Sequence, residues 1–182
     1  MWTNTFLNLS KIAMLGAATS VISSHEFTDI NGATKYMAIA SSNNGYPSQA
    51  SFGSFCNDPN INSSGWLVGS GNTPATINDY TLENRINPIG TLSANVTLRD
   101  TYDSTLLKYN RQVKITIENI SQNTITINEI GLVNTVRGFT ASGSSPTQNY
   151  VALFWRHVFD ESITLTPNDI TTIIIDFYAL FA

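Results

Sequence analysis

The 182-residue sequence predicts an all-β protein. Apolar and polar residues alternate over 112–119 and again over 124–132, which is the two-residue period of a strand with one face on a core. A short polar loop, 121–123, joins the two runs, so we expect them to pair as an antiparallel hairpin. The last third of the chain adds nearly continuous apolar strands. We therefore expect an antiparallel two-sheet β-sandwich of the jelly-roll or Ig-like kind, preceded by a short N-terminal helix.

The composition indicates one domain with few charges. Hydrophobic residues make up 42% of the chain, which is enough for one well-buried core. Charged residues make up 12%, about half the usual share, and the formal net charge is −4. A nucleic-acid partner is not expected, since binding to phosphates requires a basic patch.

Residues 1–24 form a separate segment in this prediction, and 25–182 form the β-sandwich domain. Apolar residues at three- and four-residue intervals, beginning Trp2, Phe6 and Leu9, favour a packing or anchoring helix. A signal peptide is the alternative interpretation, with Lys11 as its basic region. The apolar run is shorter than the roughly 20 residues of a membrane span, so none is predicted.

From residue 25 the sequence predicts short strands and turns. Strands are expected at 34–40, 66–68 and 92–98. Between the first two lies a long loop, 41–64, rich in Ser, Asn, Gly and Pro. Long loops in compact domains are usually functional or disordered.

The last third contains strands that are apolar on both faces. Over 150–158 and again over 172–181, neither alternating set is polar. Because a simple sandwich keeps its outer face wet, we expect this extra apolar surface to be covered by the N-terminal helix, the long loop or another subunit.

Candidate catalytic and metal-binding residues are few. Cys56 is the only cysteine, so no intrachain disulfide can form, and no catalytic signature surrounds it, His25 or His157. Asp160 and Glu161 are adjacent, and on a strand adjacent side chains point apart. We predict no catalytic residues, no cofactor, no metal site and no enzymatic activity.

Asn128 and Glu129 interrupt the second alternating run. After them the apolar positions shift parity, which predicts a β-bulge or a strand that changes sheets, and Gly131 permits either. Glu129 has two interpretations: a buried acid in a functional site, or a bulge residue whose carboxylate faces solvent or a turn amide. We favour the second, as buried acids are rare.

The order of several short motifs resembles β-sandwich virion proteins of tailed bacteriophages. The motifs are 66–74, 79–84 and 125–132, followed by 154–159, 163–165, 167–169 and a last apolar strand. The resemblance covers about 65–180, roughly two thirds of the chain. The sequence departs from the pattern at Asn168, where glycine is expected, and at Val133, where an aromatic residue is expected.

This resemblance implies a non-enzymatic structural protein located in the virion, assembled in the bacterial host cytoplasm. It would occur in a tail, neck, baseplate, head fibre or capsid surface, and its partners would be copies of itself, as a trimer or ring, and other virion proteins. The interface candidates are Trp2, Phe6, Leu9, Phe154, Trp155, Tyr178 and Phe181. Ordinary core packing is the alternative for each of them.

A carbohydrate-binding or host-adhesion module on the same scaffold is the second hypothesis. Exposed aromatic side chains in or beside the long loop could stack on the sugar rings of a host surface glycan. The candidates are Tyr46, Phe52, Phe55 and Trp66.

Overall fold

The computed structural model describes residues 1–3, 24–38, 52–58, 60–61, 63–138 and 148–180. Eight β-strands and no α-helix lie in these segments, which confirms the all-β prediction. The strands are β1 (Ser24–Thr28), β2 (Thr34–Ala38), β3 (Gly65–Gly69), β4 (Leu92–Asp103), β5 (Lys108–Asn119), β6 (Ile125–Gly138), β7 (Gln148–Leu165) and β8 (Ile170–Leu180). The N-terminal helix predicted in 1–24 falls mostly on residues outside this description.

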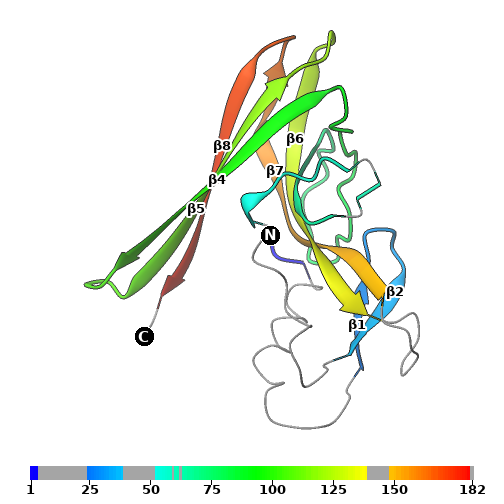
Figure 1. Ribbon diagram of the computed structural model, residues 1–182, viewed down its shortest axis with the longest axis vertical. Coiled ribbons are helices and arrows are strands. Elements are labelled where there is room, and N and C mark those ends of the chain that lie inside the picture. The colour runs from blue at the N-terminus through cyan, green and yellow to red at the C-terminus, as the bar shows by residue number, and fades with distance from the viewer. Residues whose placement is uncertain (4–23, 39–51, 59, 62, 139–147, 181–182) are drawn as a thin grey trace.

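The strands form three antiparallel sheets (Figure 1). β1 pairs with β2, while β3–β6–β7 and β4–β5–β8 are three-stranded sheets, each written in spatial order. The connections β3 to β4, β5 to β6 and β7 to β8 each carry the chain from one three-stranded sheet to the other.

The predicted hairpin between 112–119 and 124–132 is wrong, although both segments are strands. β5 pairs with β4 and β8, whereas β6 pairs with β3 and β7. Alternation reports only which face of a strand is buried, so it fits two strands that pair and equally two strands that face each other across a core.

Asn119 holds the chain where it crosses between these sheets. Its side-chain amide donates to the carbonyls of Asn123 (2.8 Å) and Leu165 (2.9 Å), and its oxygen accepts from the amide and hydroxyl of Ser121. The Asn119 side chain is fully buried, so these bonds also satisfy an amide that would be costly to leave unpaired.

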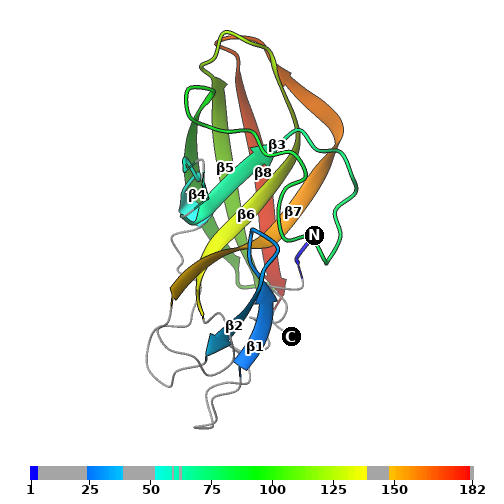
Figure 2. The same ribbon diagram turned by 90° about the vertical axis from the view of Figure 1, so that its right-hand side faces the viewer.

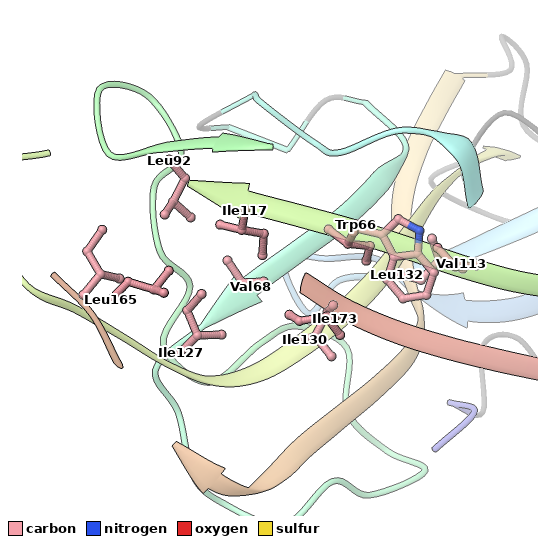
Figure 3. Packing of buried hydrophobic residues seen from close by; sticks show 12 residues of the cluster. Trp66, Val68, Leu92, Val113, Ile117, Ile127, Ile130, Leu132, Leu165 and Ile173 are labelled. Atoms are coloured by element: carbon pink, nitrogen blue, oxygen red, sulfur yellow. The ribbon is translucent and has the colours of Figure 1, made fainter. Parts of the chain in front are cut away.

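The two three-stranded sheets share one hydrophobic cluster (Figure 3). Each buried aliphatic side chain of this kind stabilises the fold by about 1.5–3 kcal/mol. One sheet contributes Trp66, Val68, Ile125, Ile127, Ile130, Leu132 and Leu165, and the other contributes Leu92, Val113, Ile115, Ile117 and Ile173.

The β3–β6–β7 sheet is also covered on its other side, in part by Cys56 of the long loop 41–64, which is one of the covers expected for the apolar strand β7. Val151 and Leu153 of β7 pack with Ile30, Cys56 and Leu82, which lie outside the sheet. On the opposite face of β7, Ala152 and Phe154 pack with Phe27 of β1. The covering residues belong to this same chain.

Both edges of the β3–β6–β7 sheet are paired over part of their length. On the β3 side the amide of Cys56 donates to the carbonyl of Trp66 (2.9 Å), and the amide of Trp66 donates to that of Ser54 (2.9 Å). On the β7 side Trp2 forms an isolated bridge with Trp155, flanked by bonds from the Thr3 amide to the Phe154 carbonyl (2.9 Å) and from the Arg156 amide to the Met1 carbonyl (3.0 Å).

The β4–β5–β8 sheet differs in both respects. β4 and β8 are its outer strands, and among the described residues no backbone hydrogen bond reaches the outer edge of β8, or of β4 beyond Leu92. Half of the sheet extends clear of the β3–β6–β7 sheet (Figure 1), and Figure 2 shows the two sheets as separate layers. This extending half includes the β4–β5 turn and the end of β8.

The bulge predicted at Asn128 and Glu129 is confirmed, since the β6–β7 register shifts between Ile127 and Glu129. Asn168, where the resemblance leads us to expect glycine, has a φ of 68°. This is the left-handed region, which asparagine tolerates better than most residues other than glycine.

Candidate functional site

Charged side chains converge on Arg156, which lies on β7 with its side chain buried. Its Nε donates to Glu129 Oε2 (2.8 Å), its Nη1 to Asp79 Oδ2 (2.8 Å) and its Nη2 to the carbonyl of Thr73 (3.1 Å). Glu83 Oε2 lies 3.9 Å from Nη2. One guanidinium therefore joins β6 and β7 to the loop between β3 and β4.

Glu129 is fully buried, and four donors surround its carboxylate. Oε1 accepts from the amides of Gly71 (3.1 Å) and Asn84 (2.9 Å), and Oε2 accepts from the amide of Glu83 (3.2 Å) as well as from Arg156. The expected turn amides are present, but the expectation of a solvent-facing carboxylate is wrong. The bulge turns Glu129 inward because the ends of the 70–86 loop supply the donors that water would otherwise supply.

Two glycines make room for this carboxylate. A Cβ at Gly71 would lie 2.6 Å from Glu129 Oε1, and a Cβ at Gly69 would collide with the same oxygen and lie 2.7 Å from the Asn84 carbonyl. Real Cβ atoms do not approach this closely, so any larger residue would displace the loop or the carboxylate.

The surroundings favour the charged forms of Asp79, Glu83 and Arg156. Burial alone would raise the pKa of Asp79, but hydrogen bonds from Thr76 and Arg156 outweigh it and lower that pKa. Burial likewise opposes the charge of Arg156, yet Asp79 and Glu129 raise its pKa. The backbone amide and hydroxyl of Thr73 lower the pKa of Glu83. These groups bind one another and the backbone, so the arrangement serves to fix the 70–86 loop against β6 and β7.

The sequence analysis does not identify this cluster. Its members are separated by 27 and 77 residues, and no local pattern links Arg156 to Asp79 or Glu129. The parity shift at Glu129 is the one signal that pointed to an unusual position.

The two candidate nucleophilic and basic residues lie in different settings. The Cys56 side chain is fully buried, with its sulfur 3.4 Å from the Ser63 carbonyl. His157 stacks on Trp155, with ring centroids 5.8 Å apart; one side of its ring is open to solvent, while desolvation on the other and the nearby N-terminal ammonium lower its pKa. The side chain of His25 lies outside the described residues. Asp160 and Glu161 are both exposed.

The predicted interface and ligand residues differ in how far they are buried. Phe154 and Trp66 are buried within the chain, and the Trp66 indole donates to the Phe52 carbonyl (2.9 Å), so neither ring is available for stacking on a ligand. Phe52, Phe55 and Trp155 are half-buried against the shared cluster. Tyr178 is 61% exposed. The remaining candidates, Phe6, Leu9, Tyr46 and Phe181, lie outside the described residues.

A pocket of about 330 Å³ opens beside the extending half of the β4–β5–β8 sheet. Arg111 borders it and is held by Asp100 through two hydrogen bonds of 2.8 Å. The guanidinium also lies over the Phe52 ring, 5.7 Å from its centroid. The other lining residues are Trp2, Tyr109, Phe177 and Tyr178.

Exposed apolar side chains gather on the same half of the sheet. Leu98 and Tyr102 on β4 are 41% and 58% exposed. Ile174 on β8 is 55% exposed but lies on the opposite face, as the cross-strand neighbour of Lys114. Leu106 and Leu107 are exposed in the β4–β5 turn. Leu98 shares a face with the buried Val113, its cross-strand neighbour, so this is the core face of the sheet continued beyond the core.

Comparison with protein-family models, curated proteins and solved structures gave no match. Within the described part of the chain, no helix has the length and apolarity of a membrane span. Nor do three or more potential metal ligands gather there.

Proposed function

We propose that the protein is a non-enzymatic structural protein of a tailed-bacteriophage virion, situated in the tail, neck, baseplate, head fibre or capsid surface. It assembles with copies of itself, as a trimer, ring or other closed assembly, and with neighbouring virion proteins. The short-motif resemblance over 65–180 supports the phage assignment, and the β4–β5–β8 sheet supports assembly.

We further infer that the two three-stranded sheets form a β-sandwich of the jelly-roll or Ig-like kind. The shared cluster and the three crossings between sheets support this inference. A short N-terminal helix within 1–24 remains part of the proposed architecture.

The observation that carries the assembly role is the uncovered half of the β4–β5–β8 sheet. A folded chain that stays alone normally protects long sheet edges and large apolar patches. Here Leu98 and Tyr102 are exposed on one face of a sheet whose outer strands have almost no backbone partner on their outer edges among the described residues, while both edges of the neighbouring sheet are paired over part of their length. A structural subunit uses such surface to contact its neighbours.

Two experiments test this function. Light scattering after size exclusion should give a closed assembly larger than the 19.9 kDa chain. Mass spectrometry of purified phage particles released by a host carrying the gene should detect the chain in amounts comparable to known virion proteins. A monomer at all concentrations that is also absent from particles would contradict the proposal.

Carbohydrate binding remains the second candidate, and the aromatic pocket favours it. Aromatic walls beside a fixed Arg111–Asp100 pair are suited to the apolar face and hydroxyl groups of a sugar. Binding on a glycan array should be lost in Tyr109→Ala and kept in Tyr80→Ala, which changes an exposed tyrosine away from the pocket. Equal binding by both variants would reject this pocket as the site.

A further inference from the structure

β4 carries the longest open edge next to the exposed apolar side chains. It spans 12 residues, pairs on one side with β5, and has no backbone partner on its other side beyond Leu92 within the described residues. Such an edge presents a row of amide and carbonyl groups that can pair with another strand over part or all of its length.

The charges on the outer face of β4 are unpaired within the chain. Arg99 and Asp103 lie on that face with Thr101 between them. Neither forms an ion pair among the described residues. Lys108 is the cross-strand neighbour of Asp103, but its ammonium lies over the Tyr178 ring, 4.0 Å from the centroid. Asp103 Oδ1 accepts from the Thr105 and Leu106 amides, which leaves its second oxygen available.

We propose that β4 pairs antiparallel with β4 of a second copy of this chain, around a two-fold axis at Thr101. Residues i and j then face each other when their numbers are equally spaced about 101, so Arg99 of each copy lies opposite Asp103 of the other and the paired segment is 99–103 of each β4. Two opposite-charge cross-strand pairs result from one register. This inference rests on the assembly role proposed above and names the surface that performs it.

The other open edge lacks this complementarity. Asp176 is the only charged residue of β8, so a two-fold pairing of β8 with itself creates no ion pair. Pairing of β4 with β8 of another copy would be heterologous and would continue into a ring or filament. The charge pattern therefore favours β4 with β4.

The apolar side chains agree with the same register. Leu98 and Tyr102 lie on the core face of β4, next to the open edge. In the two-fold arrangement the two copies of Tyr102 become diagonal neighbours, and each faces Asp100 of the other copy. The uncovered core faces of both copies then form one continuous surface.

Charge exchange tests the pairing. Arg99→Asp alone places two acids opposite each other twice, and Asp103→Arg alone does the same with two arginines, so each variant should dissociate at least tenfold more readily than the wild type. An equimolar mixture should restore the wild-type native mass, because both cross-strand pairs are again opposite in charge. Lys114→Glu, on the central strand β5, should not change the native mass. Thermal melts of each variant monitor folding, as Asp103 also supports the turn.

Cross-linking tests the register. A short bis-maleimide should join two Thr101→Cys chains into a covalent dimer, whereas Lys114→Cys should remain uncoupled; the native Cys56 is fully buried. A trimer or ring that forms normally, without cross-linking at 101 and without rescue in the mixture, would overturn the β4 pairing and leave the assembly function standing. A chain that is monomeric at all concentrations and absent from particles would overturn both.

Discussion

The two three-stranded sheets share a core but differ in how the rest of their surface is used. The β3–β6–β7 sheet has apolar residues against both faces and a chain segment along part of each edge, and the Arg156 cluster ties it to the 70–86 loop. The β4–β5–β8 sheet shares the core over part of its length only, and both its edges are open. The difference separates a region specialised for stability from one that we propose is specialised for contact.

Removing the buried acid of the covered sheet should have the largest effect. Glu129→Ala leaves Arg156 without its fully buried carboxylate partner and should lower the free energy of unfolding by about 3–5 kcal/mol. Glu118→Ala, on the outer face of β5, should change it by no more than about 0.5 kcal/mol. Urea denaturation measures both. Equal effects would show that the cluster does not stabilise its sheet preferentially.

Within the β4–β5–β8 sheet, the two faces should respond differently. Ile115→Ala removes a fully buried side chain and should cost about 2–5 kcal/mol. Ile174→Ala, which is 55% exposed in the chain, should cost less than about 1 kcal/mol in the dissociated protein. A similar cost at the two positions in chemical denaturation would mean that the outer face is not the solvent-facing one.

The close packing around the Glu129 carboxylate should also be sensitive to a single added methyl group. Gly71→Ala places a Cβ 2.6 Å from Glu129 Oε1 and should lower the unfolding free energy by about 1–3 kcal/mol, as overpacking commonly does. Gly53→Ala is the matched control, because a Cβ at Gly53 would make only ordinary contacts, whereas a Cβ at Gly90 would make none. A wild-type melting temperature in Gly71→Ala would show that the loop relaxes freely.

Acid should weaken both regions through their carboxylates. Arg111 holds the pKa of Asp100 at about 2, below its ordinary 3.8, and the pKa of Asp79 is also lowered. A lowered folded-state pKa contributes stability that is fully present above about pH 4 and is lost as the pH falls toward 2. Asp100→Asn should remove part of this pH dependence between pH 4 and 2, while Asp160→Asn should leave the profile unchanged. An Asp100→Asn profile identical to wild type would contradict the role of Arg111.

Sequence patterns predicted the strands better than their partners. The alternation over 112–119 and 124–132 located β5 and β6 correctly, because burial of one face leaves a local trace. They belong to different sheets, and Asn119 at the crossing bonds the Leu165 carbonyl, which is distant in sequence. A contact between residues far apart in the chain produces no pattern in the neighbouring sequence. The Arg156 cluster was missed for the same reason. Burial of Phe154 could not be predicted either, since Phe27 covers it from far along the chain.

Hydrogen exchange of the β4 amides, measured at low and high protein concentration, tests the central claim most directly. We expect alternate amides around Thr101 to gain protection as concentration rises, while amides of β6, which lies between β3 and β7, keep the same protection throughout. Outward β4 amides that exchange rapidly at every concentration, in a sample whose native mass shows assembly, would contradict the claim that this open sheet is where copies of the chain meet.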